Sequence, residues 1–101
     1  MARKAAVKAS EPAAAIMRRQ YLEIKRRYPQ HLCLIRCGDF YEAFDADAQT
    51  IAKATGITVN AVTINGVRLA NVGIPYHAID KYRDELISMS YKVGIADPTS
   101  V

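Results

Sequence analysis

The sequence predicts one small α/β domain of the α+β type, a mixed β-sheet with about three helices packed on it. Half of the 101 residues are hydrophobic (50%), enough for a single core. Apolar residues recur with a helical period in two segments and form short continuous runs elsewhere. An Asn-Gly pair also lies between two strand-like runs. Together these patterns indicate helices and strands that share one layered core.

The chain is expected to begin with a basic arm and a helix. Residues 1–9 are small and basic with no apolar period, which predicts a disordered arm ahead of a domain over residues 10–101. Ser10 is a suitable N-cap, and a carboxylate and a proline follow it in the first turn. Pro29 marks the end of this helix. Its apolar stripe comprises Met17, Tyr21, Ile24 and Tyr28.

Extended chain and a second helix are expected next. Residues 32–35 are a continuous apolar run, typical of a strand buried on both faces. Gly38-Asp39 allows the backbone to bend, and the aromatic segment 40–44 is expected to be extended. Asp45 can cap a helix that runs to about Thr55, with Ile51 and Ala52 on its buried side and Gly56 as its stop.

The C-terminal half predicts a hairpin, a helix and a last strand. Residues 57–64 and 67–74 flank Asn65-Gly66, and a type I′ turn requires positive φ at both of its central residues. A helix follows Pro75, and residues 91–96 read as a strand. The expected order is therefore helix, strand, helix, hairpin, helix, strand. The apolar face of the last helix comprises Ile79, Tyr82, Leu86 and Met89.

Composition excludes several classes of protein. No apolar run approaches the roughly 20 residues of a membrane span, and no secretory signal is recognisable, so a cytoplasmic protein is expected. Cys33 and Cys37 would lie roughly 13 Å apart along a strand, too far for a disulfide. With only His31 and His77 as further soft ligands, a metal site is not expected, and buried thiols are the simpler interpretation.

Positive charge is concentrated at the N-terminal end. The chain carries +4 overall, but residues 1–27 hold eight basic and two acidic residues, a net charge of +6. The remaining six basic and eight acidic residues give −2. A basic end on a nearly neutral body suggests an acidic partner such as nucleic acid. The alternative is that these lysines and arginines only keep a helix solvated.

No catalytic constellation is evident. The sequence has no glycine-rich phosphate loop and no nucleophile elbow, and no cofactor is expected. An acidic cluster could in principle hold a divalent metal for a nuclease. The alternative is that two of its members are carboxylates favoured at the start of a helix. The cluster comprises Asp39, Glu42, Asp45 and Asp47.

The segment around Phe40 is the most informative one. Residues two apart in extended chain point to the same side, roughly 6–7 Å apart, so Phe40 and Glu42 would project together and Tyr41 would face the other way. An aromatic ring can wedge between base steps while a carboxyl group bonds a base edge. The alternative is that Phe40 is an ordinary core residue.

A family resemblance adds to this interpretation. Four segments, in the same order and at similar spacing over about residues 16–96, resemble the N-terminal mismatch-recognition domain (domain I) of MutS-type DNA mismatch repair proteins. They are MRRQYLEIK (17–25), RCGDFYEAF (36–44), GIPYHA (73–78) and YKVGI (91–95). In that family a Phe-x-Glu motif inserts the Phe beside a mispaired base and bonds the base through the Glu.

By resemblance these two roles belong to Phe40 and Glu42, and the implied partner is mismatched or kinked double-stranded DNA. Basic residues would add mainly sequence-blind attraction to phosphates, and Arg68 or the arm would replace the longer basic loop that the family often has after its third strand. The remaining candidate DNA-binding residues are Lys4, Arg18, Arg19, Arg36 and Arg68.

The resemblance also carries expectations about what is missing. Family members have connector, lever, clamp and ATPase domains that this sequence lacks, so a non-catalytic module without ATPase activity is expected, associated with the nucleoid when bound to DNA. An interaction module that partners or modulates other mismatch repair proteins, with little DNA affinity of its own, is the alternative. A metal nuclease is the third possibility. The sequence leaves the oligomeric state open.

Overall fold

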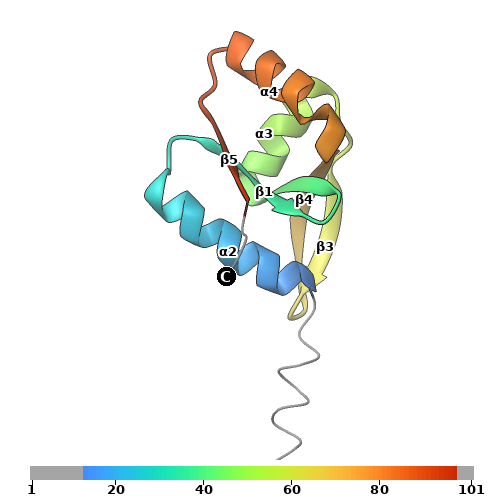
Figure 1. Ribbon diagram of the computed structural model, residues 1–101. Helices are drawn as coiled ribbons and strands as arrows, with labels where there is room; N and C mark the ends of the chain where they lie inside the picture. The colour runs from blue at the N-terminus through green and yellow to red at the C-terminus, as the bar shows by residue number, and fades with distance from the viewer. Residues whose placement is uncertain (1–12, 98–101) are drawn as a thin grey trace, which may run out of the picture.

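The computed structural model describes residues 13–97, which form helices α2, α3 and α4 and a five-stranded sheet (Figure 1). The chain runs α2, β1, β2, α3, β3, β4, the 3-10 helix η1, α4 and β5. Their bounds are Ala13–Arg27 for α2, Leu32–Cys37 for β1, Phe40–Phe44 for β2, Asp45–Thr55 for α3, Asn60–Ile64 for β3, Val67–Pro75 for β4, Tyr76–Ala78 for η1, Ile79–Ser88 for α4 and Val93–Ala96 for β5. The expected α+β class with three packed helices is confirmed.

The sheet is mixed, with strand order β3-β4-β2-β1-β5. β5 lies parallel to β1, and the other neighbouring pairs are antiparallel. β2 therefore lies in the middle of the sheet, between β4 and β1. Every residue of β2 has register partners, among them Pro75 opposite Phe40 and Gly73 opposite Glu42.

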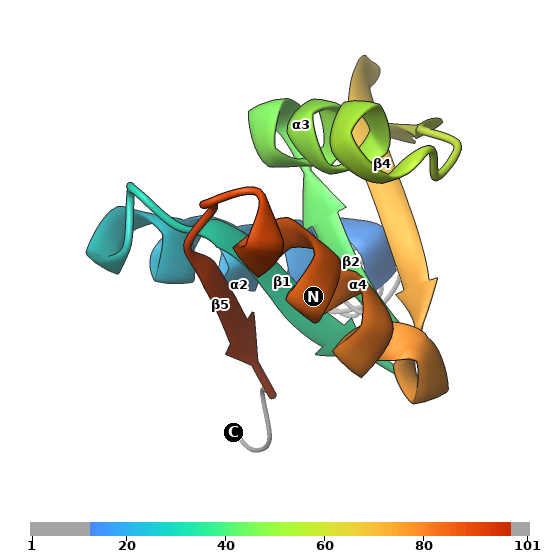
Figure 2. The same ribbon diagram turned by 90° about the horizontal axis from the view of Figure 1, so that it is seen from above.

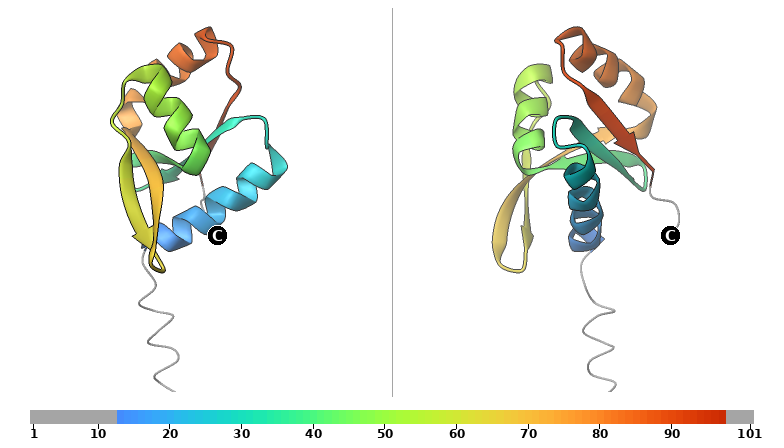
Figure 3. Two further views of the ribbon diagram at one scale, coloured as in Figure 1. Left: turned by 180° about the vertical axis from the view of Figure 1, so that it is seen from behind. Right: turned by 90° about the vertical axis from the view of Figure 1, so that its left-hand side faces the viewer.

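Helices cover both faces of the sheet. α2 lies on one face, and α3 and α4 lie on the other, as the views from above and from the side show (Figures 2 and 3). Leu32, Leu34 and Ile35 of β1 are all buried, as a strand with helices on both faces requires. On the α2 side the rings of Tyr21 and Phe44 meet edge to face, with centroids 5.4 Å apart.

Two turns depend on residues that tolerate positive φ. The β3–β4 hairpin turns at Asn65 and Gly66, whose φ values of 51° and 79° fit the predicted type I′ turn. α3 ends at Gly56, which has φ 85° and donates its backbone N–H to the Ala52 carbonyl. Both expectations are confirmed.

Several predicted details are wrong. Residues 32–37 and 40–44 are two strands joined by a tight turn at Gly38-Asp39, so a second hairpin precedes α3. Asp45 makes no cap hydrogen bond, because Phe44 is the N-cap residue and Asp45 itself has φ 56°. Tyr28 and Met89 lie just beyond the ends of α2 and α4, where they are exposed.

Other boundaries shift slightly. β3 begins at Asn60 rather than at residue 57, and β5 begins at Val93 rather than at residue 91. Met17 and Ile24 pack against the core around the buried Tyr21, as the stripe predicted. The predicted arm over residues 1–9 and the Ser10 cap lie outside the described residues.

Candidate nucleic-acid interface

An exposed aromatic ring lies on the sheet face that α2 covers only in part. α2 packs over the Phe44 end of β2, through the contact between Tyr21 and Phe44. Phe40 is at the other end of the same strand, and 44% of its surface is exposed, although Phe44 is fully buried. The prediction that residues 40–44 are extended is confirmed, and the alternative that Phe40 is an ordinary core residue is wrong.

The ring of Phe40 rests on a glycine of the neighbouring strand. A Cβ atom built on Gly73 would lie 3.6 Å from Cδ1 of Phe40, which is ordinary van der Waals contact. Gly73 is the register partner of Glu42, so ring and carboxylate lie on one face, as their spacing predicted. We call this surface the Phe40 patch, and it comprises Cys37, Phe40, Glu42, Asn71 and Gly73.

Glu42 is partly buried and has neighbours on both adjacent strands. Asn71 of β4 donates from Nδ2 to Oε1 of Glu42 over 3.2 Å, and from the same nitrogen to the Ala43 carbonyl over 3.1 Å. Burial raises the pKa of the Cys37 thiol on β1, and the negative charge of the nearby Glu42 carboxylate raises that pKa further.

Arg36 lies beside the patch but on the opposite face of the sheet, because successive strand residues alternate. Its guanidinium carbon is 4.6 Å from the centroid of the Tyr76 ring and 5.6 Å from that of Tyr41. Its Nε donates to the Gly38 carbonyl over 2.6 Å. The Tyr76 amide in turn donates to the Asp39 carbonyl over 2.8 Å, so the Pro75–Ala78 block is tied to the β1–β2 turn through its backbone.

Arg18, Arg19 and Arg68 are not gathered around Phe40. Arg18 on α2 forms an ion pair with Asp45 over 2.8 Å, at the Phe44 end of β2. Arg19 lines a hollow with Ile64 and Asn65 of the β3–β4 hairpin. Arg68 is seven residues from Pro75 along β4, roughly 23 Å at 3.3 Å per residue. Lys4 lies outside the described residues.

The acidic cluster does not form one site. Asp45 pairs with Arg18, whereas Glu42 faces Asn71. Asp47 is buried at the junction of α2, β1 and α3, where it accepts hydrogen bonds from the Tyr21 hydroxyl, the Lys25 ammonium and the Cys33 amide. Across residues 13–97 no three metal-ligating side chains come together.

The Asp47 junction also affects the titration of two buried groups. Burial raises the pKa of the Tyr21 phenol well above its usual value, and the hydrogen bond to Asp47 raises it further. Burial also raises the pKa of the Cys33 thiol, a free thiol like that of Cys37. The hydrogen bonds of Asp47 join α2 and β1 to α3 in a position that is closed to solvent.

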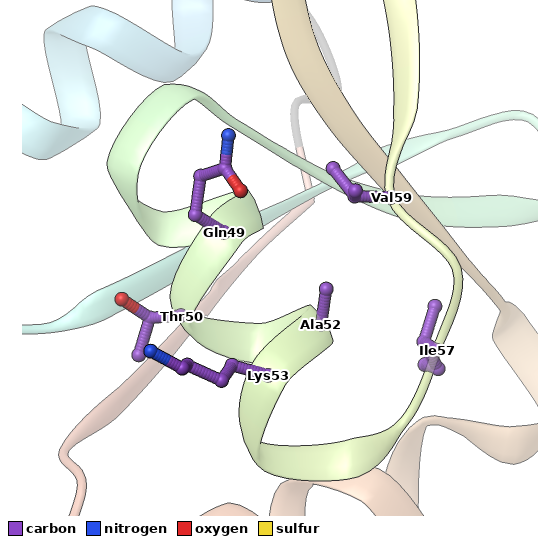
Figure 4. Close-up of a pocket in the computed structure, with 6 residues that line it drawn as sticks. All are labelled: Gln49, Thr50, Ala52, Lys53, Ile57 and Val59. Atoms are coloured by element: carbon purple, nitrogen blue, oxygen red, sulfur yellow. The ribbon is translucent and has the colours of Figure 1, made fainter.

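One hollow shares no lining residue with the Phe40 patch. It has a volume of about 510 Å³ and lies between α3 and the segment that enters β3 (Figure 4). Lys53 is its one titratable side chain, so it brings no acid and base together. Its other lining residues are Gln49, Thr50, Ala52, Ile57 and Val59.

Asn71 was not singled out from the sequence, although it touches Glu42. Its proximity depends on the pairing of β2 with β4, which places Phe44 opposite Asn71 and makes Glu42 a diagonal neighbour. The Asn65–Gly66 turn fixes the register of β3 against β4 but not that of β4 against β2. No local signal in the sequence could therefore have identified this residue.

Within residues 13–97 no helix combines the length and the apolar character needed to cross a membrane.

Known proteins are similar to this chain over most of its length. The family model described as MutS domain I matches residues 15–101. A protein named DNA mismatch repair protein MutS from Methanosarcina mazei is 51% identical over 81 residues, 78% of this chain and 9% of the relative. Proteins of the same name from Dehalococcoides mccartyi and Thermus thermophilus are 42% and 38% identical over 80% and 77% of the chain. The chain spans about a tenth of the length of these relatives.

Proposed function

The chain belongs to the MutS domain I family, and on that premise we propose that it is a non-catalytic module that binds mismatched or distorted duplex DNA. Phe40 is the wedge that enters the base stack, and Glu42 is the hydrogen-bonding partner of the displaced base. The observation that carries this proposal is the exposed ring of Phe40 beside Glu42, on a part of the sheet that α2 leaves open.

The position of Phe40 suits a wedge. The ring contacts Gly73 of the neighbouring strand, and Phe40 itself belongs to the middle strand of the sheet. A base stacked on the ring would therefore meet the sheet rather than a flexible loop. A mismatched step is poorly stacked and easily kinked, so inserting a ring costs less there than in matched duplex. The preference for a mismatch then comes from the deformability of the DNA rather than from a base code.

Electrostatic attraction contributes little close to Phe40. Arg36 is the nearest of the candidate cations along the chain, and Asp39 lies immediately beside Phe40. Arg18, Arg19 and Arg68 would act on more distant phosphates and without sequence preference, and Lys4 would add attraction of the same sequence-blind kind. A single module buries only about 600–1,000 Å² of protein surface on DNA, so we expect weak and salt-sensitive binding.

The test is a comparison of a G·T-mismatched duplex with its matched twin, by fluorescence anisotropy at low and moderate salt. Wild type is expected to bind the mismatch more tightly, and Phe40→Ala is expected to lose about tenfold in that preference, because stacking of one base on an aromatic ring contributes roughly 1–3 kcal/mol. The matched control is Tyr28→Ala, because Tyr28 is also an exposed aromatic residue but lies beyond the end of α2.

Two results would overturn the proposal. The wedge is excluded if Phe40→Ala and Tyr28→Ala retain the same mismatch preference as wild type. The DNA-binding function is excluded if wild type binds neither duplex at low salt, and the interaction with other repair proteins then becomes the better hypothesis. Binding that falls steeply as salt rises, with equal slopes for both duplexes, would support the assignment of a sequence-blind role to the basic residues.

A further inference from the structure

Glu42 has side-chain neighbours on both of the strands beside β2, and these neighbours have no part in the function proposed above. β2 is flanked by β4 and β1, so a residue at its centre has diagonal neighbours on two sides. Asn71 approaches from β4 with Nδ2 3.2 Å from Oε1 of Glu42. Cys37 lies on the same face of β1, opposite Phe40 and diagonal to Glu42.

The orientation of the Asn71 amide is fixed independently of Glu42. Its nitrogen also lies 3.1 Å from the backbone carbonyl oxygen of Ala43, which can only accept a hydrogen bond. The amide must therefore turn its nitrogen, not its oxygen, toward β2. The nitrogen carries two protons, one for each of its two acceptors, Ala43 and Glu42, so the backbone of β2 helps to set the direction from which Oε1 is bound.

We propose that Asn71 is a positioning residue for Glu42, whose amide, anchored on the Ala43 carbonyl, holds the carboxyl group in one orientation beside Phe40 for contact with a base. This inference rests on the proposed function of the Phe40 patch. Without the hydrogen bond from Asn71, the Glu42 side chain would lose its rotamer freedom only on binding DNA. With this hydrogen bond, the side chain has already lost that freedom on folding. Asn71 thus increases mismatch preference without touching DNA itself.

The test measures the same two duplexes with Asn71→Leu and Asn71→Asp, in the wild-type and in the Glu42→Ala background. Leu is close to Asn in size but has no donor, and Asp places an acceptor where the donor was. We expect the ratio of matched to mismatched dissociation constants to fall about five- to tenfold with Leu and further with Asp. In the Glu42→Ala background both substitutions are expected to leave the ratio unchanged, which a merely structural role would not produce.

The matched control is Asn60→Leu, because Asn60 is the register partner of Asn71 on the edge strand β3. Thermal unfolding of each variant separates a loss of folding from a loss of positioning. A readout without DNA comes from the side-chain amide signals of Asn71 in ¹⁵N-labelled protein. These signals are expected to be protected from exchange in wild type and to lose part of that protection in Glu42→Ala.

The outcomes separate this inference from the function on which it rests. If wild type prefers the mismatch but the Asn71 variants keep that preference, or lose it equally in both backgrounds, the positioning role is overturned and the wedge stands. If wild type shows no mismatch preference, the proposed function fails and the recognition role of Asn71 fails with it. The amide signals would then report only whether the bridge is a structural contact of the free domain.

Discussion

The buried carboxylate of Asp47 offers the strongest test of how the fold is held together. Only 5% of Asp47 is exposed, and it accepts hydrogen bonds from Tyr21 on α2, Lys25 on α2 and the backbone of Cys33 on β1. Asp47 itself belongs to α3, so one side chain joins the two helical layers to the sheet. Replacing it with alanine leaves a partly buried ammonium and a buried amide without their partner.

The expected loss of stability in Asp47→Ala follows from these partners. Breaking a buried ion pair by removing one member typically destabilises a protein by about 3–5 kcal/mol. For a domain of this size each kcal/mol lowers the melting temperature by about 4–8 °C, so Asp47→Ala should lower it by roughly 12–40 °C. Urea and thermal unfolding followed by circular dichroism measure both quantities.

The control is Asp80→Ala on α4. Asp80 forms a 3.0 Å ion pair with Arg83, but 78% of its side chain is exposed, so the expected cost is below about 0.5 kcal/mol. The reasoning is refuted if Asp47→Ala costs less than about 1 kcal/mol, because the carboxylate would then contribute no more than an exposed one.

Three further predictions concern titration, thiol reactivity and a turn. Because the pKa of Tyr21 is raised, the folded protein keeps a proton that the unfolded chain loses at high pH. The stability that this proton contributes is present below about pH 10 and is lost as pH rises further. Between about pH 9 and 11, the free energy of unfolding in urea should therefore fall more steeply for wild type than for Tyr21→Phe, by up to about 1.4 kcal/mol per pH unit. Because Glu42 raises the pKa of the Cys37 thiol, alkylation of the folded protein near pH 8, followed by mass spectrometry, should be faster in Glu42→Gln, and an unchanged rate would contradict their contact. Gly66→Ala should lower the free energy of unfolding by about 1 kcal/mol or more, because φ is 79° at this position. Its control is Gly94→Ala, which should be close to neutral in the same unfolding assay, because an added Cβ would meet His31 at an ordinary 3.8 Å.

Local patterns predicted most of the elements of this fold. The Asn65–Gly66 turn, the Gly56 helix stop and the buried strand around Leu34 each depend on residues close together in sequence. The extended conformation of the segment that contains Phe40 also followed from its composition. These features are set by backbone sterics and by periodicity, both of which are visible in a single sequence.

Most of the details that the sequence did not predict depend on long-range packing. The positive φ of Asp45 allows α3 to begin directly after β2, and the ion pair with Arg18 on α2 uses the carboxylate that was expected to cap the helix. The tight β1–β2 turn was missed because Gly38-Asp39 was interpreted as a bend within extended chain. The contact of Asn71 with Glu42 requires the register of β4 on β2, which no local signal specifies.

The central claim is that Phe40 enters the base stack and kinks the duplex, and the bend itself is the most direct measurement. A G·T-mismatched duplex and its matched twin, each labelled with a donor and an acceptor dye at opposite ends, are saturated with protein, and the end-to-end distance is read by energy transfer. Wild type should shorten that distance for the mismatched duplex only, because a wedged step kinks by about 20–90°. At saturation Phe40→Ala should leave the duplex straight, and an equal bend with Phe40→Ala would contradict the claim.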